Sequence, residues 1–237
     1  MKKLLFISFL VLNFYAELGA ASYKQSLIKA LEYEAQENYK ASSTHYKKAI
    51  IELTSRLNSQ KIKLFSNVSL NMYPTIHKGD EIITIQTDVV HRGKLIIFPY
   101  PKDETVFYTE RCVATAGDRL FIKDKNLYLH PKEGNAYIKS VFEGFTQVNI
   151  EGKLFVKNPY KSIHFDANMK DDGQYPKQLF ALALTQVPKG EFFALGDNGD
   201  HSNDSRFFGS VKKKNLYRPI FVLNNDADES RVGIALN

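Results

Sequence analysis

The sequence predicts a mainly β fold: an antiparallel sheet domain over residues 61–237, preceded by an α-helical segment. After Gln60, short apolar or alternating runs are separated by Gly, Pro, Asp or Asn, which is the pattern of antiparallel strands and their turns. Before it, residues 22–58 contain neither proline nor glycine and carry apolar residues near helical spacing. With 237 residues, 43% of them hydrophobic and 24% charged, the chain is able to bury a core.

The N-terminus has the pattern of an export signal. Lys2 and Lys3 precede an apolar run from Leu4 to Ala16, and small residues follow. This run is shorter than the roughly 20 residues that a membrane-spanning helix needs. We therefore expect residues 1–21 to be a signal peptide, with a short anchor as the alternative. Both place the rest of the chain in the periplasm or at the outer face of the cytoplasmic membrane.

The helical segment 22–60 resembles a single tetratricopeptide repeat. Matching residues are Ala30, Tyr33, Tyr46 and Ala49. We expect a helical hairpin or one bent helix that packs on the following domain. The alternative is that residues 22–58 dock a protein partner.

The β-rich part divides into strand-forming runs and an inserted piece. Runs with strand character are 80–90, 93–101, 105–117, 118–130 and 190–197. Residues 121–187 are expected to form an inserted β subdomain, because this stretch continues the strand and turn pattern but carries no recognisable motif beyond Pro131.

Charge and metal-binding residue types exclude several functions. The formal net charge of +6 favours attraction to an anionic membrane surface and gives no evidence for nucleic-acid binding. Cys112 is the single cysteine, so an internal disulfide framework and a cysteine zinc site are excluded, and a buried strand thiol is expected. The six histidines lack ligand spacing, so neither a metal nor a cofactor is predicted.

Three motifs occur in order along the chain. They are SNVSLNMYPTIHKGD at 66–80, YTERCVATAGDRL at 108–120 and GDNGDHSNDSRFFGSV at 196–211. Together they resemble the bacterial type I signal peptidases, or leader peptidases, which are membrane-bound serine peptidases with a Ser/Lys dyad that remove leader sequences from exported proteins. The third motif matches best, with one departure at Gly199, where the family usually has arginine.

The resemblance implies that both catalytic residues are replaced. Asn71 stands at the position of the nucleophilic serine, and Glu110 at that of the lysine base. A carboxamide nitrogen is a poor nucleophile because its lone pair is delocalised, and Glu110 has no hydroxyl beside it to activate. Loss of such a nucleophile lowers turnover on the order of a millionfold. We expect no leader-peptidase activity by the family mechanism.

Other family positions are kept. Ser69 matches the side-chain donor to the oxyanion, and Ser202 the serine that hydrogen-bonds the base. The resemblance further implies two structural ion pairs, Arg111 with Asp197 and Asp204 with Arg206, and substrate contacts by Met72, Tyr73 and Pro74.

These expectations favour an exported, catalytically inactive homologue with a cleft for leader-like or extended peptides of exported proteins. One alternative is an active signal peptidase with a variant mechanism. In this mechanism Glu110 would activate a water, with Asn71 and Ser69 polarising the scissile carbonyl, or another serine, Ser66 or Ser69, would act with Glu110 or with a lysine such as Lys78. A second alternative is an assembly protein whose helical segment is the functional part.

Overall fold

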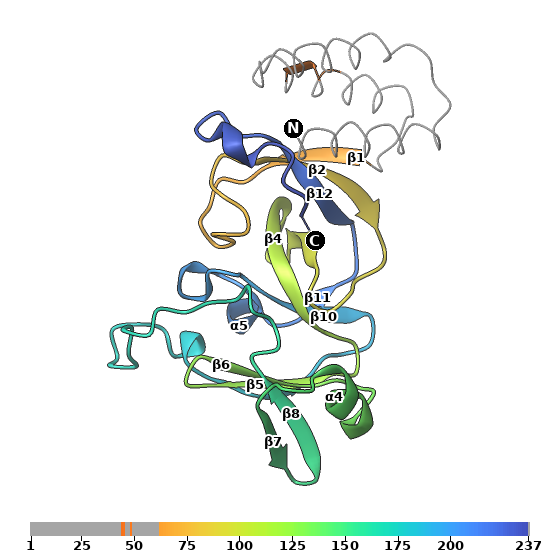
Figure 1. The fold of residues 1–237 in the computed structure, drawn as a ribbon, viewed down its shortest axis with the longest axis vertical. Helices are drawn as coiled ribbons and strands as arrows, with labels where there is room; N and C mark the ends of the chain where they lie inside the picture. Colours follow the sequence, from red (N-terminus) through yellow and green to blue (C-terminus); the bar gives the residue numbers. More distant parts are fainter. Residues whose placement is uncertain (1–43, 46–47, 49–61, 237) are drawn as a thin grey trace. The chain divides into compact units, whose positions relative to one another are not determined.

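The computed structural model describes residues 44, 45, 48 and 62–236 (Figure 1). The predicted signal or anchor, 1–21, lies outside these residues, as does most of the helical segment 22–60 with its predicted docking role. Thr44, His45 and Lys48, the described residues of that segment, are helical. Within the described part of the chain, no helix combines the length and the apolar character needed to span a bilayer.

The described residues form two compact units. Unit 1 contains 44, 45, 48, 62–68, 78–86 and 217–236, and unit 2 contains 69–77 and 87–216. The strands of unit 1 lie in the order β1 (Ile62–Ser66), β2 (Glu81–Thr87) and β12 (Leu216–Asn224), with a short helix η3 (Glu229–Arg231) near its C-terminal end.

A buried acid organises unit 1. The Asp80 carboxylate is fully buried and pairs with the Arg231 guanidinium at 2.8 Å. Asn225 Nδ2 donates to the same carboxylate at 2.7 Å. Because a buried charge is tolerated only when it is paired and hydrogen-bonded, these contacts join the start of β2 to the segment after β12.

The first sheet of unit 2 is built on a long hairpin. Its strands, in order, are β3 (Leu95–Tyr100), β4 (Asp103–Thr115), β10 (Glu191–Leu195) and β11 (Val211–Lys212). All neighbouring pairs are antiparallel, and β10 pairs only with the C-terminal part of β4, residues 111–115. Cys112 is fully buried in the core of this sheet, as expected.

The second sheet of unit 2 comes from the stretch between β4 and β10. It has the order β7 (Gln147–Ile150), β8 (Lys153–Lys157), β6 (Asn126–His130), β5 (Arg119–Lys123) and β9 (Leu182–Gln186). The helix α4 (Asn135–Val141) contacts β8 and buries Ile138 (Figure 1). Further short helices of unit 2 are η1 (Lys177–Leu179), η2 (Gly199–His201) and α5 (Ser205–Phe208).

One hydrophobic core joins the two sheets of unit 2. Val113 and Phe193 of the first sheet pack with Leu120 and Leu129 of the second. The predicted insertion 121–187 covers most of the second sheet, although β5 begins earlier, at Arg119. The subdomain boundary itself stays a prediction. The mainly antiparallel β class is confirmed.

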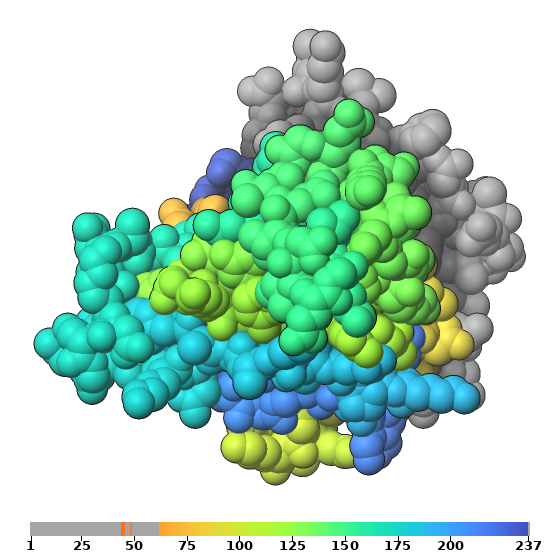
Figure 2. Space-filling view, turned by 90° about the horizontal axis from the view of Figure 1, so that it is seen from below, coloured from red at the N-terminus to blue at the C-terminus, as the bar shows by residue number. Residues whose placement is uncertain are grey.

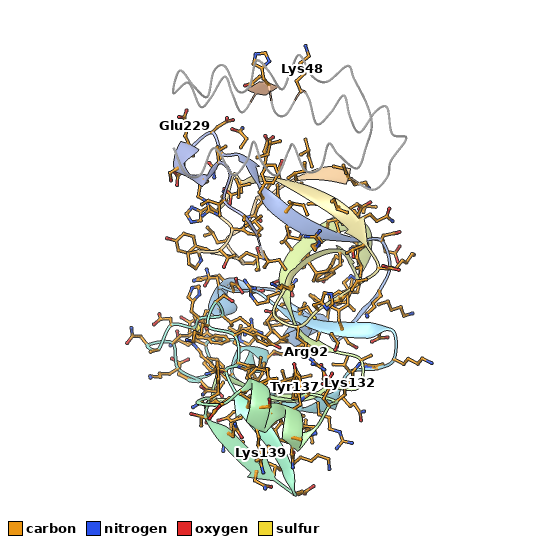
Figure 3. The ribbon with its side chains drawn as sticks, turned by 45° about the vertical axis from the view of Figure 1, so that its right-hand side comes forward. Lys48, Arg92, Lys132, Tyr137, Lys139 and Glu229 are labelled. Carbon is orange, nitrogen blue, oxygen red and sulfur yellow. The ribbon has the colours of Figure 1, made fainter. Side chains whose placement is uncertain are left out.

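An ion pair supports the same junction. Arg92 donates to both carboxylate oxygens of fully buried Asp118, at 2.6 and 2.5 Å. The Arg92 guanidinium also pairs with Glu133 at 2.8 Å and lies 5.9 Å from the Tyr137 ring. Figure 3 shows Arg92 and Tyr137 together, with Lys132, whose backbone N–H donates to Asp118 at 2.9 Å. These contacts attach the chain around α4 to the turn between β4 and β5.

Replacing Leu129 by alanine tests the shared core. Leu129 is fully buried, so Leu129→Ala should lower the free energy of unfolding by about 2–5 kcal/mol in urea titrations. Leu184 on β9, 58% exposed, is the control, and Leu184→Ala should change stability by less than about 0.5 kcal/mol. Equal losses for the two variants would contradict this core.

Candidate functional site

The loop of the first motif, residues 69–77, is anchored by Met72. This side chain is fully buried, and its sulfur accepts a hydrogen bond from the Asp197 backbone N–H at 3.4 Å. Backbone bonds from Tyr73 N–H to the Leu70 carbonyl and from Ile76 N–H to the Met72 carbonyl, 3.1 and 2.9 Å long, fold the loop, and the Tyr73–Pro74 peptide bond is cis. The loop therefore presents Asn71 in a fixed position.

The third motif approaches this loop closely because it contains Gly196. A Cβ at Gly196 would lie 2.6 Å from the Asn71 carbonyl oxygen and 2.4 Å from Ser202 Oγ, so no larger residue fits. Next to it, the Asn198 backbone N–H donates to the Asn71 carbonyl at 2.9 Å, and Asn198 Nδ2 donates to the Leu70 carbonyl at 3.1 Å. Position 71 is thus set by the third motif.

The Asn71 carboxamide is hydrogen-bonded on every side. Its Nδ2 donates to the Thr109 carbonyl at 2.8 Å and to Glu110 Oε1 at 3.0 Å. Its Oδ1 accepts a short hydrogen bond from the Ser69 hydroxyl. Asn71 and Glu110 are therefore in direct contact, and the Ser69 hydroxyl is directed at Asn71.

Glu110, on β4, is fully buried. Burial raises the pKa of its carboxyl well above the ordinary value of 4.5, and the negative charge of Asp204 raises it further. Hydrogen bonds from Asn71 and Ser202 and the charge of Arg206 oppose this rise in pKa but do not cancel it. The Ser202 hydroxyl is 3.4 and 3.5 Å from the two carboxylate oxygens, so its contact with Glu110 is weak.

Both expected ion pairs form and are buried. Arg111 Nε and Nη2 donate to the two carboxylate oxygens of Asp197 at 2.7 and 2.6 Å. Arg206 Nε and Nη2 donate to Asp204, each at 2.8 Å, and Asp204 accepts from the Gly196 backbone N–H at 3.1 Å. Such bidentate pairs hold β4 and the third motif in one arrangement.

The structure thus brings Ser69, Asn71, Glu110 and Ser202 together. Of the predicted substrate-binding residues, Tyr73 and Pro74 are exposed, whereas Met72 is buried and offers no accessible surface. Substrate contact by these residues stays a prediction. Ser66 and Lys78, the alternative catalytic groups, belong to unit 1, whereas Glu110 belongs to unit 2.

Two contacts were not predicted from the sequence. The Thr109 carbonyl accepts from Asn71, and the Phe165 ring lies against Gly199. The one sequence signal for the contact of Phe165 with Gly199 was the glycine itself, at a position where the family usually has arginine. Within residues 44, 45, 48 and 62–236, no group of three or more His, Cys, Asp or Glu side chains is placed to hold a metal ion.

Comparison with known proteins agrees with the motifs. A family model described as signal peptidase, peptidase S26, matches residues 50–222, and the chain belongs to this family. Signal peptidase I of Helicobacter pylori strain J99 is 32% identical over 156 residues, which cover 56% of this chain and 54% of the relative. Signal peptidase I of Aquifex aeolicus is 27% identical over 195 residues, which cover 65% of this chain and 72% of the relative.

The chain spans about half the length of the Helicobacter relative, 54%. A crystal structure of a signal peptidase I from Enterococcus faecalis is 22% identical, with 56% of this chain and 97% of that chain covered. Its TM-score of 0.31 is too low to bear on the arrangement of the site.

Replacing Glu110 by glutamine should remove a pH dependence of stability. The folded protein keeps the Glu110 proton at pH values where the unfolded chain has released it, so the stability of the wild type falls as pH rises from 4.5 toward the raised pKa. Unfolding free energies should be measured for both proteins across this pH range. The stability of Glu110→Gln relative to the wild type should increase as pH rises. Glu104→Gln, at an exposed carboxylate, is the control and should show no such gain. A constant difference for Glu110→Gln would contradict the raised pKa.

Proposed function

We propose that this protein is an exported member of the signal peptidase family that lacks the family's Ser/Lys chemistry and binds leader-like or extended peptides of exported proteins. The observation that carries the proposal is the contact between Asn71 and Glu110, at 3.0 Å, at the two dyad positions. The site is intact in its packing but holds an amide and a buried carboxyl.

The hydrogen bonds argue against peptidase chemistry. A Ser/Lys dyad needs a neutral amine that takes a hydroxyl proton. Over the described part of the chain, no lysine contacts Asn71, Glu110 or Ser202 by a hydrogen bond or ion pair. The Ser69 hydroxyl donates to Asn71 rather than to Glu110. The hydroxyl that does contact Glu110 is that of Ser202, and its distances of 3.4 and 3.5 Å make this contact weak.

The alternative of a Glu110-activated water is also disfavoured. A carboxyl accepts a proton from water only when it is ionised, and full burial together with Asp204 raises the pKa of Glu110. This side chain has no solvent-exposed surface. The burial that raises the pKa of Glu110 also keeps this side chain away from bulk water.

Peptide binding is supported by an edge of β4. Residues 111–115 of this strand pair with β10, but β10 does not extend along the residues before Arg111. On that part of β4, the Thr109 carbonyl accepts from Asn71. An extended peptide pairs with an exposed strand edge through its backbone and gains specificity from side-chain contacts. Leu70 and Tyr73 on the adjacent loop, 53% and 46% exposed, provide apolar surface for an apolar leader.

The proposed setting follows from the N-terminal pattern. A signal or anchor at 1–21 places the protein in the periplasm or at the outer face of the cytoplasmic membrane, where leader peptides of exported proteins are present. The net charge of +6 favours contact with an anionic membrane surface. Residues 22–58 are proposed to contact a protein partner.

Restoring the dyad tests the loss of chemistry. The purified wild type should release no leader from a preprotein, whereas the double variant Asn71→Ser with Glu110→Lys should release it, because a hydroxyl and an amine then occupy two positions already in contact. Gel analysis of the cleaved preprotein measures both. Each single variant is a control and should be inactive. Leader release by the wild type that disappears in Glu110→Gln would overturn the proposal in favour of an enzyme.

Titration with a peptide ending in an A-x-A leader sequence tests the cleft. Leu70→Asp should weaken binding about tenfold, equivalent to about 1.4 kcal/mol, because it places a charge on the apolar surface beside β4. Leu184→Asp is matched in exposure, 58% against 53%, but lies on the second sheet and should bind like the wild type. Absence of binding by the wild type, or equal losses for both variants, would argue against a peptide cleft at this loop.

A further inference from the structure

The third motif is held on two sides by different segments. The Asn198 backbone N–H donates to the Asn71 carbonyl, at 2.9 Å. The backbone groups of the two neighbouring residues bond to His164 instead. The Asp197 carbonyl accepts from the His164 N–H at 2.9 Å, and the Gly199 N–H donates to the His164 carbonyl at 3.0 Å. This is the pattern of a parallel bridge between His164 and Asn198. Residues 197–199 therefore lie between the Asn71 loop and the segment 163–166.

Gly199 allows this second contact. A Cβ at Gly199 would lie 2.1 Å from Cε1 of the Phe165 ring and 2.5 Å from Cδ1, and the three heavy atoms nearest to it all belong to this ring. The Phe165 ring also lies 5.6 Å from the guanidinium of Arg206, which donates to the Gly199 carbonyl. Phe165 thus fills the space that a side chain at position 199 would need.

Three polar contacts fix the end of the segment. The Asp166 N–H donates to the Asp200 carboxylate at 2.5 Å. Lys125 Nζ pairs with the same carboxylate at 2.8 Å and donates to the Asp166 carbonyl at 3.0 Å. Because Lys125 and Asp200 are largely buried, this charge pair is protected from screening by solvent.

The other side of the segment borders open space. His164, Phe165 and Asp166 line a cavity of about 570 Å³. Figure 2 shows the chain around residues 160–180, in cyan, at the surface of the molecule. Packing from the cavity side is therefore incomplete. The position of 163–166 depends on the packing of Ile163 against the core of unit 2 and on the contacts of 164–166 with 197–200 and Lys125.

We propose that Phe165 is a positioning residue for the peptide cleft. Its ring against Gly199 holds the segment 163–166 on the third motif, and Asn198 passes this constraint to the loop that carries Asn71. The effect of Phe165 on peptide binding rests on the proposed function, whereas the contact between Phe165 and Gly199 does not.

A double-mutant cycle of Gly199→Ala and Phe165→Ala tests the contact, with hydrogen exchange of the His164 and Gly199 amides as the measurement. Gly199→Ala alone should speed exchange at both amides by about tenfold or more, because the added methyl group displaces the ring and opens the bridge. In the Phe165→Ala background, Gly199→Ala should cause no further increase in the exchange rates, since the ring that the added methyl group would displace is absent. Equal effects in the two backgrounds, or no effect of Gly199→Ala in the wild type, would overturn the proposal.

Phe207→Ala is the matched control. Phe207 is also half-buried and lies 5.8 Å from the same Arg206 guanidinium, but it contributes none of the three heavy atoms nearest to a Cβ at Gly199. Phe165→Ala should weaken binding of the A-x-A peptide about tenfold, and Phe207→Ala should leave it unchanged. Equal affinities for these two variants would overturn the positioning role. If the wild type binds no peptide, the proposed function fails, while the exchange cycle still decides whether the contact exists.

Discussion

The buried ion pair of Arg111 and Asp197 is the contact on which the rest of the site depends. It joins β4 to the third motif, and Arg111 directly follows Glu110 in the strand. An unpaired charge at this depth destabilises a fold by several kcal/mol, so the strand and the motif stay together whether or not a reaction takes place. The geometry of the site is therefore maintained by groups other than the two that would carry out chemistry, and Asn71 and Glu110 are accommodated without loss of the frame.

Asn71 and Glu110 form a complementary pair of side chains. A carboxamide offers two N–H donors and one acceptor, and here Thr109, Glu110 and Ser69 satisfy them. A buried carboxyl is stable in its neutral form, which the raised pKa of Glu110 favours. Asn71, Glu110, Thr109 and Ser69 thus form a closed hydrogen-bond network, in which low local polarity strengthens each hydrogen bond.

The resemblance of the three motifs to signal peptidases predicts the part of this arrangement that depends on short stretches of sequence. It implies the ion pair of Arg111 with Asp197, which is present, and it directs attention to positions 71 and 110, which the structure shows in contact. It does not predict the division into units, because unit 1 is assembled from pieces far apart in the chain. The Phe165 contact is equally inaccessible, since the stretch after Pro131 has no motif and its packing depends on tertiary contacts. The burial of Met72 in a loop expected to meet substrate likewise follows from packing rather than local pattern.

The closed network around Asn71 also makes positions 71 and 110 interdependent. A serine at position 71 alone would remove the amide donor from a carboxyl that has no solvent contact, and a lysine at position 110 alone would set an ammonium against an amide N–H. Each of these single substitutions leaves a buried polar group without its partner and therefore lowers the stability of the fold. The interior of the protein thus tolerates a change of chemistry at these two positions only when both side chains are exchanged together.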